Sequence, residues 1–158
     1  MTRTLILPGL HNSDPDHWQS RWEAEDETLQ RVIQDDWETP HCAEWVARLE
    51  QALERTGTET LLVAHSAGCA LVARFAPMPL VRFPFPTVVV ASSNDPFVTV
   101  VRARTFAKAW GSKFVMIGEA GHINSDSGLS DWPEGRALLN TLRETPNKSQ
   151  TTQATVLA

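Results

Sequence analysis

Short apolar runs alternate with longer amphipathic stretches along this chain of 158 residues. The apolar runs are rich in Val, Ile and Leu and are bounded by Gly, Pro or Asp, which is typical of buried parallel strands. They predict five strands, at 4–7, 29–33, 60–64, 87–91 and 113–117.

Between these runs, apolar residues recur at helical spacing. The clearest helix begins at Pro40 and ends at Gly57, residue types that favour helix starts and ends. Helices are predicted at 16–23, 40–56, 69–76, 100–110 and 133–142. The alternation predicts one α/β domain over residues 1–144, a three-layer sandwich with a mostly parallel sheet of about five strands and helices on both faces.

Two segments lack this pattern. Four prolines between residues 77 and 86 exclude a regular element there. From residue 145 onward the chain is polar, so residues 145–158 are expected to form a disordered C-terminal tail.

Composition narrows the function classes. The chain is 42% hydrophobic and carries a net charge of −5, so a nucleic acid is not an expected partner. No basic patch or long apolar run indicates a membrane. The first apolar run ends at Pro8-Gly9, too early for a signal peptide, so a cytoplasmic protein is expected.

The two cysteines are expected to be reduced, and the five scattered histidines lack the spacing of a zinc site, so neither a metal nor a cofactor is expected.

The candidate nucleophile is Ser66, at the junction of a predicted strand and helix. It stands in Ala64-His65-Ser66-Ala67-Gly68, with small residues two positions before and after it. A serine on such a tight turn is exposed at a helix N-terminus, where the partial positive charge favours an oxyanion. The Ala67 N–H is the expected first oxyanion donor, and Leu10, after Pro8-Gly9, is the candidate for the second.

Ser66 needs a base, and His122 in a glycine-rich loop is the candidate. Asp95 follows the strongest strand and is the candidate to orient His122. Each of the three alone fits a structural role, as a tight turn, a helix cap or a loop residue. Their order, with each just past a different strand, favours a Ser-His-Asp triad.

Other histidines and tryptophans near this edge are weaker candidates. His65 adjoins Ser66, and its ring is expected to point away from it. His11 and His17 lie near the site, where a surface role is favoured. Trp18 is a candidate wall for an acyl pocket, although helix packing is favoured.

The sequence resembles a known family in several segments in order, over about residues 3–143. The segments are Leu7–Leu10, His17–Glu23, His65–Cys69, Ser92–Pro96, Gly118–Asn124 and Ser127–Gly135. They are similar to the small α/β-hydrolases of the retinoblastoma-binding protein 9 and YdeN type. The resemblance implies a lidless serine hydrolase with Ser66, Asp95 and His122 as its triad, and it supplies no substrate.

The chain departs from that family after the nucleophile helix. About one β–α unit, on the order of 30 residues, is missing near residues 74–80. Loss of a strand between those carrying Ser66 and Asp95 would move Asp95 sideways by about 4.8 Å, far beyond the roughly 0.5 Å that catalysis tolerates. Loops could compensate, a gap could persist, or the triad could be broken, and the exposed apolar surface would favour aggregation or dimerisation.

Three functional readings follow. The first is a carboxylesterase-like serine hydrolase that acts on a small-molecule ester or similar acyl substrate. The second is a catalytically impaired or inactive binding protein of the same fold, and the third is a non-functional truncated product. The sequence predicts neither the substrate nor the oligomeric state.

Overall fold

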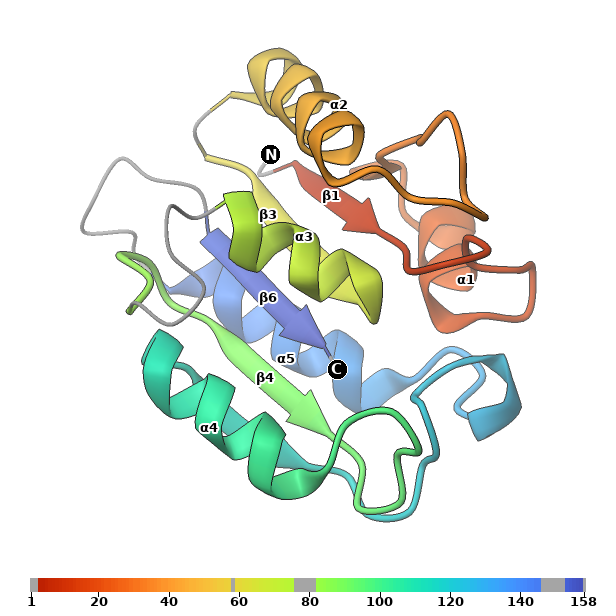
Figure 1. Ribbon diagram of the computed structural model, residues 1–158, viewed down its shortest axis with the longest axis vertical. Helices are drawn as coiled ribbons and strands as arrows, with labels where there is room; N and C mark the ends of the chain where they lie inside the picture. The colour runs from red at the N-terminus through yellow and green to blue at the C-terminus, as the bar shows by residue number, and fades with distance from the viewer. Residues whose placement is uncertain (1–2, 58, 76–81, 146–152, 158) are drawn as a thin grey trace.

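A parallel sheet of six strands forms the centre of the computed structural model, which describes residues 3–57, 59–75, 82–145 and 153–157 (Figure 1). Every neighbouring pair of strands is parallel. The carboxyl ends of the strands therefore meet at one edge of the sheet, where α/β proteins place their sites. In sheet order the strands are β2 (Leu29–Arg31), β1 (Thr4–Leu7), β3 (Leu61–His65), β6 (Gln153–Leu157), β4 (Val88–Ala91) and β5 (Lys113–Met116).

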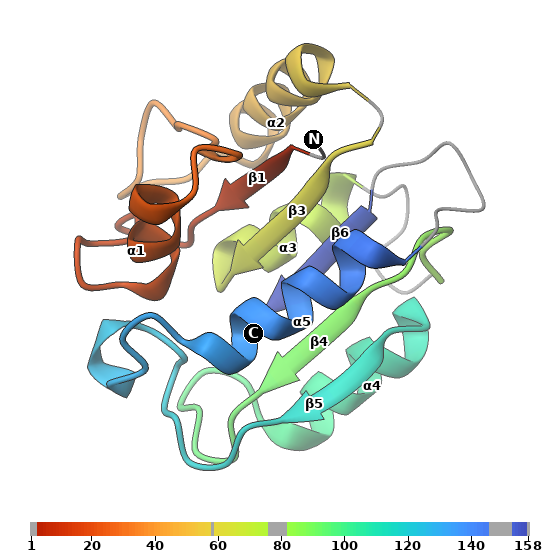
Figure 2. The same cartoon turned by 180° about the vertical axis from the view of Figure 1, so that it is seen from behind.

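Helices cover both faces of the sheet, as Figures 1 and 2 show from opposite sides. Alternate strand residues point to opposite faces. Leu5 and Leu7 of β1 therefore join one core with α2, α3 and α4, whereas Ile6 joins a second core with α1 and α5. The predicted three-layer α/β architecture is confirmed. The helices are α1 (Trp18–Glu25), α2 (Cys42–Thr56), α3 (Ala67–Phe75), α4 (Val100–Trp110) and α5 (Pro133–Glu144), with a 3₁₀ turn at Ser125–Ser127.

Local sequence signals explain where the helices begin and end. The Thr99 side chain accepts the Arg102 N–H at the start of α4, and Gly111 ends that helix at φ 70°. The predicted stop at Gly57 closes α2 with φ 84°. Glycine adopts these positive φ values without steric cost.

The C-terminal segment differs from expectation. Residues 145–158 were predicted to be a disordered tail, yet Gln153–Leu157 forms β6 between β3 and β4. β6 pairs along its whole length with β3, from Leu61↔Gln153 to His65↔Leu157, and its last part pairs with β4. The Thr and Val in this segment favour a strand, and the partners on both sides supply its hydrogen bonds. Residues 146–152 and 158 of the predicted tail lie outside the described residues.

β6 also changes the expectation about the missing β–α unit. Loss of that unit was expected to shift Asp95, leave a gap or be offset by loops. Instead, a strand from a later part of the chain lies between β3, which leads to Ser66, and β4, which leads to Asp95. The spacing of one intervening strand is therefore kept. Residues 76–81 of the shortened connection lie outside the described residues.

Candidate active site

Ser66 occupies the tight turn between β3 and α3. Its φ is 53°, a region that residues other than glycine rarely adopt. The turn packs so closely on the end of β1 that a Cβ on Gly68 would lie 2.2 Å from the Leu7 carbonyl oxygen. Glycine is therefore required two positions after Ser66, as the sequence motif suggested. The strained turn presents the serine hydroxyl at the N-terminus of α3.

Ser66, His122 and Asp95 form one line of hydrogen bonds across the carboxyl edge of the sheet. Ser66 Oγ lies 2.9 Å from His122 Nε2, and His122 Nδ1 lies 2.9 Å from Asp95 Oδ2. A carboxylate can only accept, so Nδ1 donates to Asp95. Nε2, on the other side of the ring, can then accept the hydrogen bond of the Ser66 hydroxyl. The structure thus brings together the three side chains predicted from the sequence.

The Asp95 carboxylate is held in place by its own loop. Only 3% of its side chain is exposed. Its Oδ1 accepts the N–H groups of Phe97, at 2.8 Å, and Val98, at 3.3 Å. Together with His122 Nδ1, these donors satisfy the buried carboxylate, which therefore keeps one orientation.

Side chains on both sides of the loop that carries His122 hold its backbone in place. Ser92 Oγ accepts the Ala120 N–H and Asn94 Oδ1 accepts the Gly121 N–H. Two further bonds come from the other side of the loop. Trp18 Nε1 donates to the Ile123 carbonyl at 2.7 Å. His65 Nε2 donates to the His122 carbonyl, also at 2.7 Å. The imidazole is therefore positioned from both flanks.

Trp18 packs with Trp22 and Trp132, as expected of a helix-packing residue.

Sequence reasoning missed the role of His65 and His17. His65 is 5% exposed, and its ring lies between those of His17 and His122, with centroid distances of 4.8 and 4.9 Å. The expectation of a surface role for His17 was wrong, because this residue is 3% exposed and its Nδ1 accepts the Gln19 N–H at the start of α1. A histidine directly before a helix was the available signal. His11, by contrast, is exposed and pairs with Glu38.

Burial makes these two histidines poor bases. It is the main cause of the lowered pKa of both residues, about 4 for His65 and about 3 for His17, and the proximity of the His65 ring contributes to the lowered pKa of His17. An unfolded chain binds protons at these residues near pH 6.5. Below pH 6.5 the unfolded chain therefore binds protons at His17 and His65, whereas the folded protein leaves both residues unprotonated until lower pH.

Stability is accordingly expected to fall as pH decreases from about 6.5 to 4, by up to ~1.4 kcal/mol per pH unit for each histidine. Urea unfolding at several pH values would measure this slope. His17→Asn keeps an acceptor at the helix start and removes one titrating group, so its slope should be about half as steep. A wild-type stability that does not change over this range would contradict the assignment.

The backbone beside Ser66 leaves room for a substrate oxygen. A Cβ on Gly9 would lie 3.2 Å from Ser66 Oγ and 3.3 Å from the Ala67 nitrogen. Glycine at this position therefore keeps open the space beside the Ala67 N–H. Leu10, the other candidate donor, is the next residue and is 45% exposed.

Within the described ranges, no group of three or more His, Cys, Asp or Glu side chains could hold a metal ion. In the same part of the chain, no helix has both the length and the apolar character needed to cross a bilayer.

The sequence profile of the serine hydrolase family matches this chain over residues 4–78 and 71–141. The two matched segments overlap at residues 71–78. A break in the match at this place agrees with a shortened connection after the nucleophile helix. No functionally curated protein matches the chain significantly.

Solved structures of hydrolases are similar over most of the chain. A YdeN-like hydrolase from Pectobacterium atrosepticum is 30% identical with a TM-score of 0.85, and the match covers 91% of each chain. The Bacillus subtilis ydeN gene product is 18% identical, with a TM-score of 0.74 over 92% of this chain and all of that one. An α/β serine hydrolase homologue from Coxiella burnetii is 16% identical, with a TM-score of 0.63 over 92% of this chain and 86% of the other. The last two support the fold alone.

Proposed function

Because the chain belongs to the serine hydrolase family, we propose that it hydrolyses a carboxylic ester or similar small acyl compound at Ser66. The observation that carries this proposal is the hydrogen-bonded line from Ser66 through the His122 ring to Asp95, with 2.9 Å at both contacts of the ring. That geometry matches the roles of nucleophile, base and orienting acid.

The proposed ester hydrolysis begins at the Ser66 hydroxyl. Ser66 Oγ bonds to the substrate carbonyl carbon while its proton passes to His122 Nε2. Asp95 stabilises the resulting imidazolium. The bond to the leaving group then breaks as Nε2 returns the proton to the departing oxygen. Water, deprotonated by the same nitrogen, cleaves the acyl-enzyme and restores Ser66.

The negative charge that develops on the carbonyl oxygen needs donors. The Ala67 N–H at the start of α3 is the first donor in this proposal, and the Leu10 N–H is the second. One observation supports the arrangement: a Cβ at position 9 would meet Ser66 and Ala67, and Gly9 has none. The helix N-terminus adds a favourable dipole.

The alternative of an inactive binding protein rested on the missing β–α unit near residues 74–80, and a large separation of Asp95 from His122 would have favoured it. The 2.9 Å contact between these two side chains supports the hydrolase instead.

Labelling with a fluorophosphonate tests the proposal. Attack by an activated serine forms an O–P bond and releases fluoride, and an ordinary serine hydroxyl reacts far more slowly. We expect the native protein to acquire one adduct, located on Ser66 by peptide mass spectrometry. Ser66→Ala and urea-unfolded protein serve as controls and should stay unlabelled. A folded wild-type protein without an adduct, or with its adduct on another residue, would refute the proposal.

A further inference from the structure

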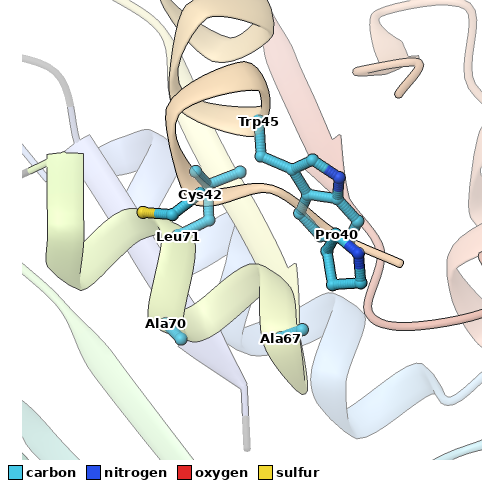
Figure 3. Close-up of a pocket in the computed structure, with 6 residues that line it drawn as sticks. All are labelled: Pro40, Cys42, Trp45, Ala67, Ala70 and Leu71. Carbon is cyan, nitrogen blue, oxygen red and sulfur yellow. The ribbon is translucent and has the colours of Figure 1, made fainter. Parts of the chain in front are cut away.

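A small apolar cavity lies between α2 and α3, and its lining includes Ala67, the residue after the proposed nucleophile. Its volume is about 190 Å³. Figure 3 shows the Trp45 indole beside Pro40, with the α3 side chains across from them. The lining residues are Pro40, Cys42, Trp45, Ala67, Ala70 and Leu71.

The lining excludes a polar ligand group. No lining side chain carries a charge, and the one strong donor, Trp45 Nε1, is already bonded to the Asp36 carbonyl at 3.1 Å. A polar group placed here would lose its hydrogen bonds to water without replacement. A cavity of about 150 Å³ accommodates a benzene-sized group, so this one suits about four to six carbon atoms.

The position of the cavity assigns it to one end of the substrate. It borders Ala67, the residue after Ser66, whereas a wider hollow of about 560 Å³ borders His122. Since His122 protonates the leaving group, that group must lie on the histidine side. The hollow there is mixed in character, because Asn94, Glu119 and Asp126 line it together with Pro96 and Phe97.

We propose that the cavity between α2 and α3 is the acyl pocket, and that the substrates are esters of short apolar acids of about four to six carbons. This inference rests on the proposed hydrolysis at Ser66. It places the acyl chain against Ala70 and Leu71, with Cys42 at the exposed rim.

A series of p-nitrophenyl esters from acetate to dodecanoate tests the chain length. We expect kcat/KM to rise about fourfold per methylene up to butyrate or hexanoate and to fall for longer acids. Ala70 is exposed on α3, so Ala70→Leu should fold and fill the cavity. This variant should lose about tenfold or more with hexanoate and keep its activity with acetate. Ala43→Leu, at an exposed site on α2 outside the cavity, is the matched control and should change neither value.

Cys42 gives a second readout that does not require turnover or a variant. Ser66 would first be modified with an ethyl or a hexyl fluorophosphonate, and the protein then treated with N-ethylmaleimide. The hexyl adduct should slow alkylation of Cys42, measured on its own peptide, by at least severalfold relative to the ethyl adduct. Equal rates would overturn the pocket assignment and leave the proposed function standing, as would a kcat/KM that is highest for acetate. Failure of both fluorophosphonates to modify Ser66 would instead reject the hydrolase itself.

Discussion

Replacing His122 with alanine is expected to lower kcat for ester hydrolysis by about 10⁶-fold, and Asp95→Asn by about 10⁴-fold, with small changes in KM. Without His122, nothing takes the proton from Ser66. Asparagine at position 95 presents an amide in place of the carboxylate beside Nδ1, so the ring loses its preferred tautomer and the stabilisation of its charge. Steady-state kinetics on the best ester of the series would measure both effects.

The three residues should act as a unit. Ser66→Ala combined with His122→Ala should lose no more than either single change, because each already abolishes the same step. His11→Asn and Asp35→Asn are matched controls, since His11 and Asp35 are exposed and pair at the surface with Glu38 and Arg48. If His122→Ala kept more than about 1% of wild-type kcat, another base would have to be sought.

Deletion of residues 146–158 is expected to lower the melting temperature by about 10–20 °C or to prevent cooperative folding. β6 bonds to strands on both sides, and net values near 1 kcal/mol per hydrogen bond give a loss of roughly 5 kcal/mol. That is a large share of the 5–15 kcal/mol that stabilises a typical domain. For a chain of this size, 1 kcal/mol corresponds to about 2–4 °C. Thermal unfolding followed by circular dichroism would measure the change.

Further variants distinguish the contribution of β6 to stability from that of the other deleted residues. Thr155→Pro removes one ladder N–H in the middle of β6 and should reproduce most of the loss, whereas Thr155→Val keeps a β-branched side chain and should not. A peptide of residues 149–158, added to the deletion protein, should restore part of the stability and of the Ser66 labelling. In the intact chain, hydrogen exchange at residues 153–157 should be slow. A deletion protein with unchanged melting and labelling would show that β6 contributes nothing.

The fold and the three residues of the proposed triad could be predicted because their signals are local. Apolar runs marked the strands, and the small residues around Ser66 marked the tight turn. The order of Ser66, Asp95 and His122 then identified which side chains would meet, since each follows a different parallel strand. These signals depend on the backbone within a few residues and on the direction of the strands, both of which the sequence carries.

The features that could not be predicted depend on tertiary partners. The Thr and Val of Gln153–Leu157 favour a strand, but so short a segment is stable as one only because β3 and β4 pair with it on both sides. His65 and His17 become buried because α1 packs against the site. The position of His17 directly before a helix was the one available signal, and nothing around His65 indicated its burial. Helix packing was the favoured role of Trp18 and is observed, whereas nothing in the sequence indicated that Trp45, from a different helix, lines the cavity between α2 and α3.

The position of β6 has a consequence for biosynthesis. Ribosomes make β1, β3, β4 and β5 before the strand that belongs at the centre of the sheet. Until residues 153–157 emerge, the nascent chain has two half-sheets, each with an open edge that can pair with the other half or with another chain. Folding must therefore end with a contact between residues about 90 positions apart, such as Val63 and Thr155, and such non-local contacts form slowly. We expect this protein to depend on chaperones during synthesis more than hydrolases whose central strands are made in sequence.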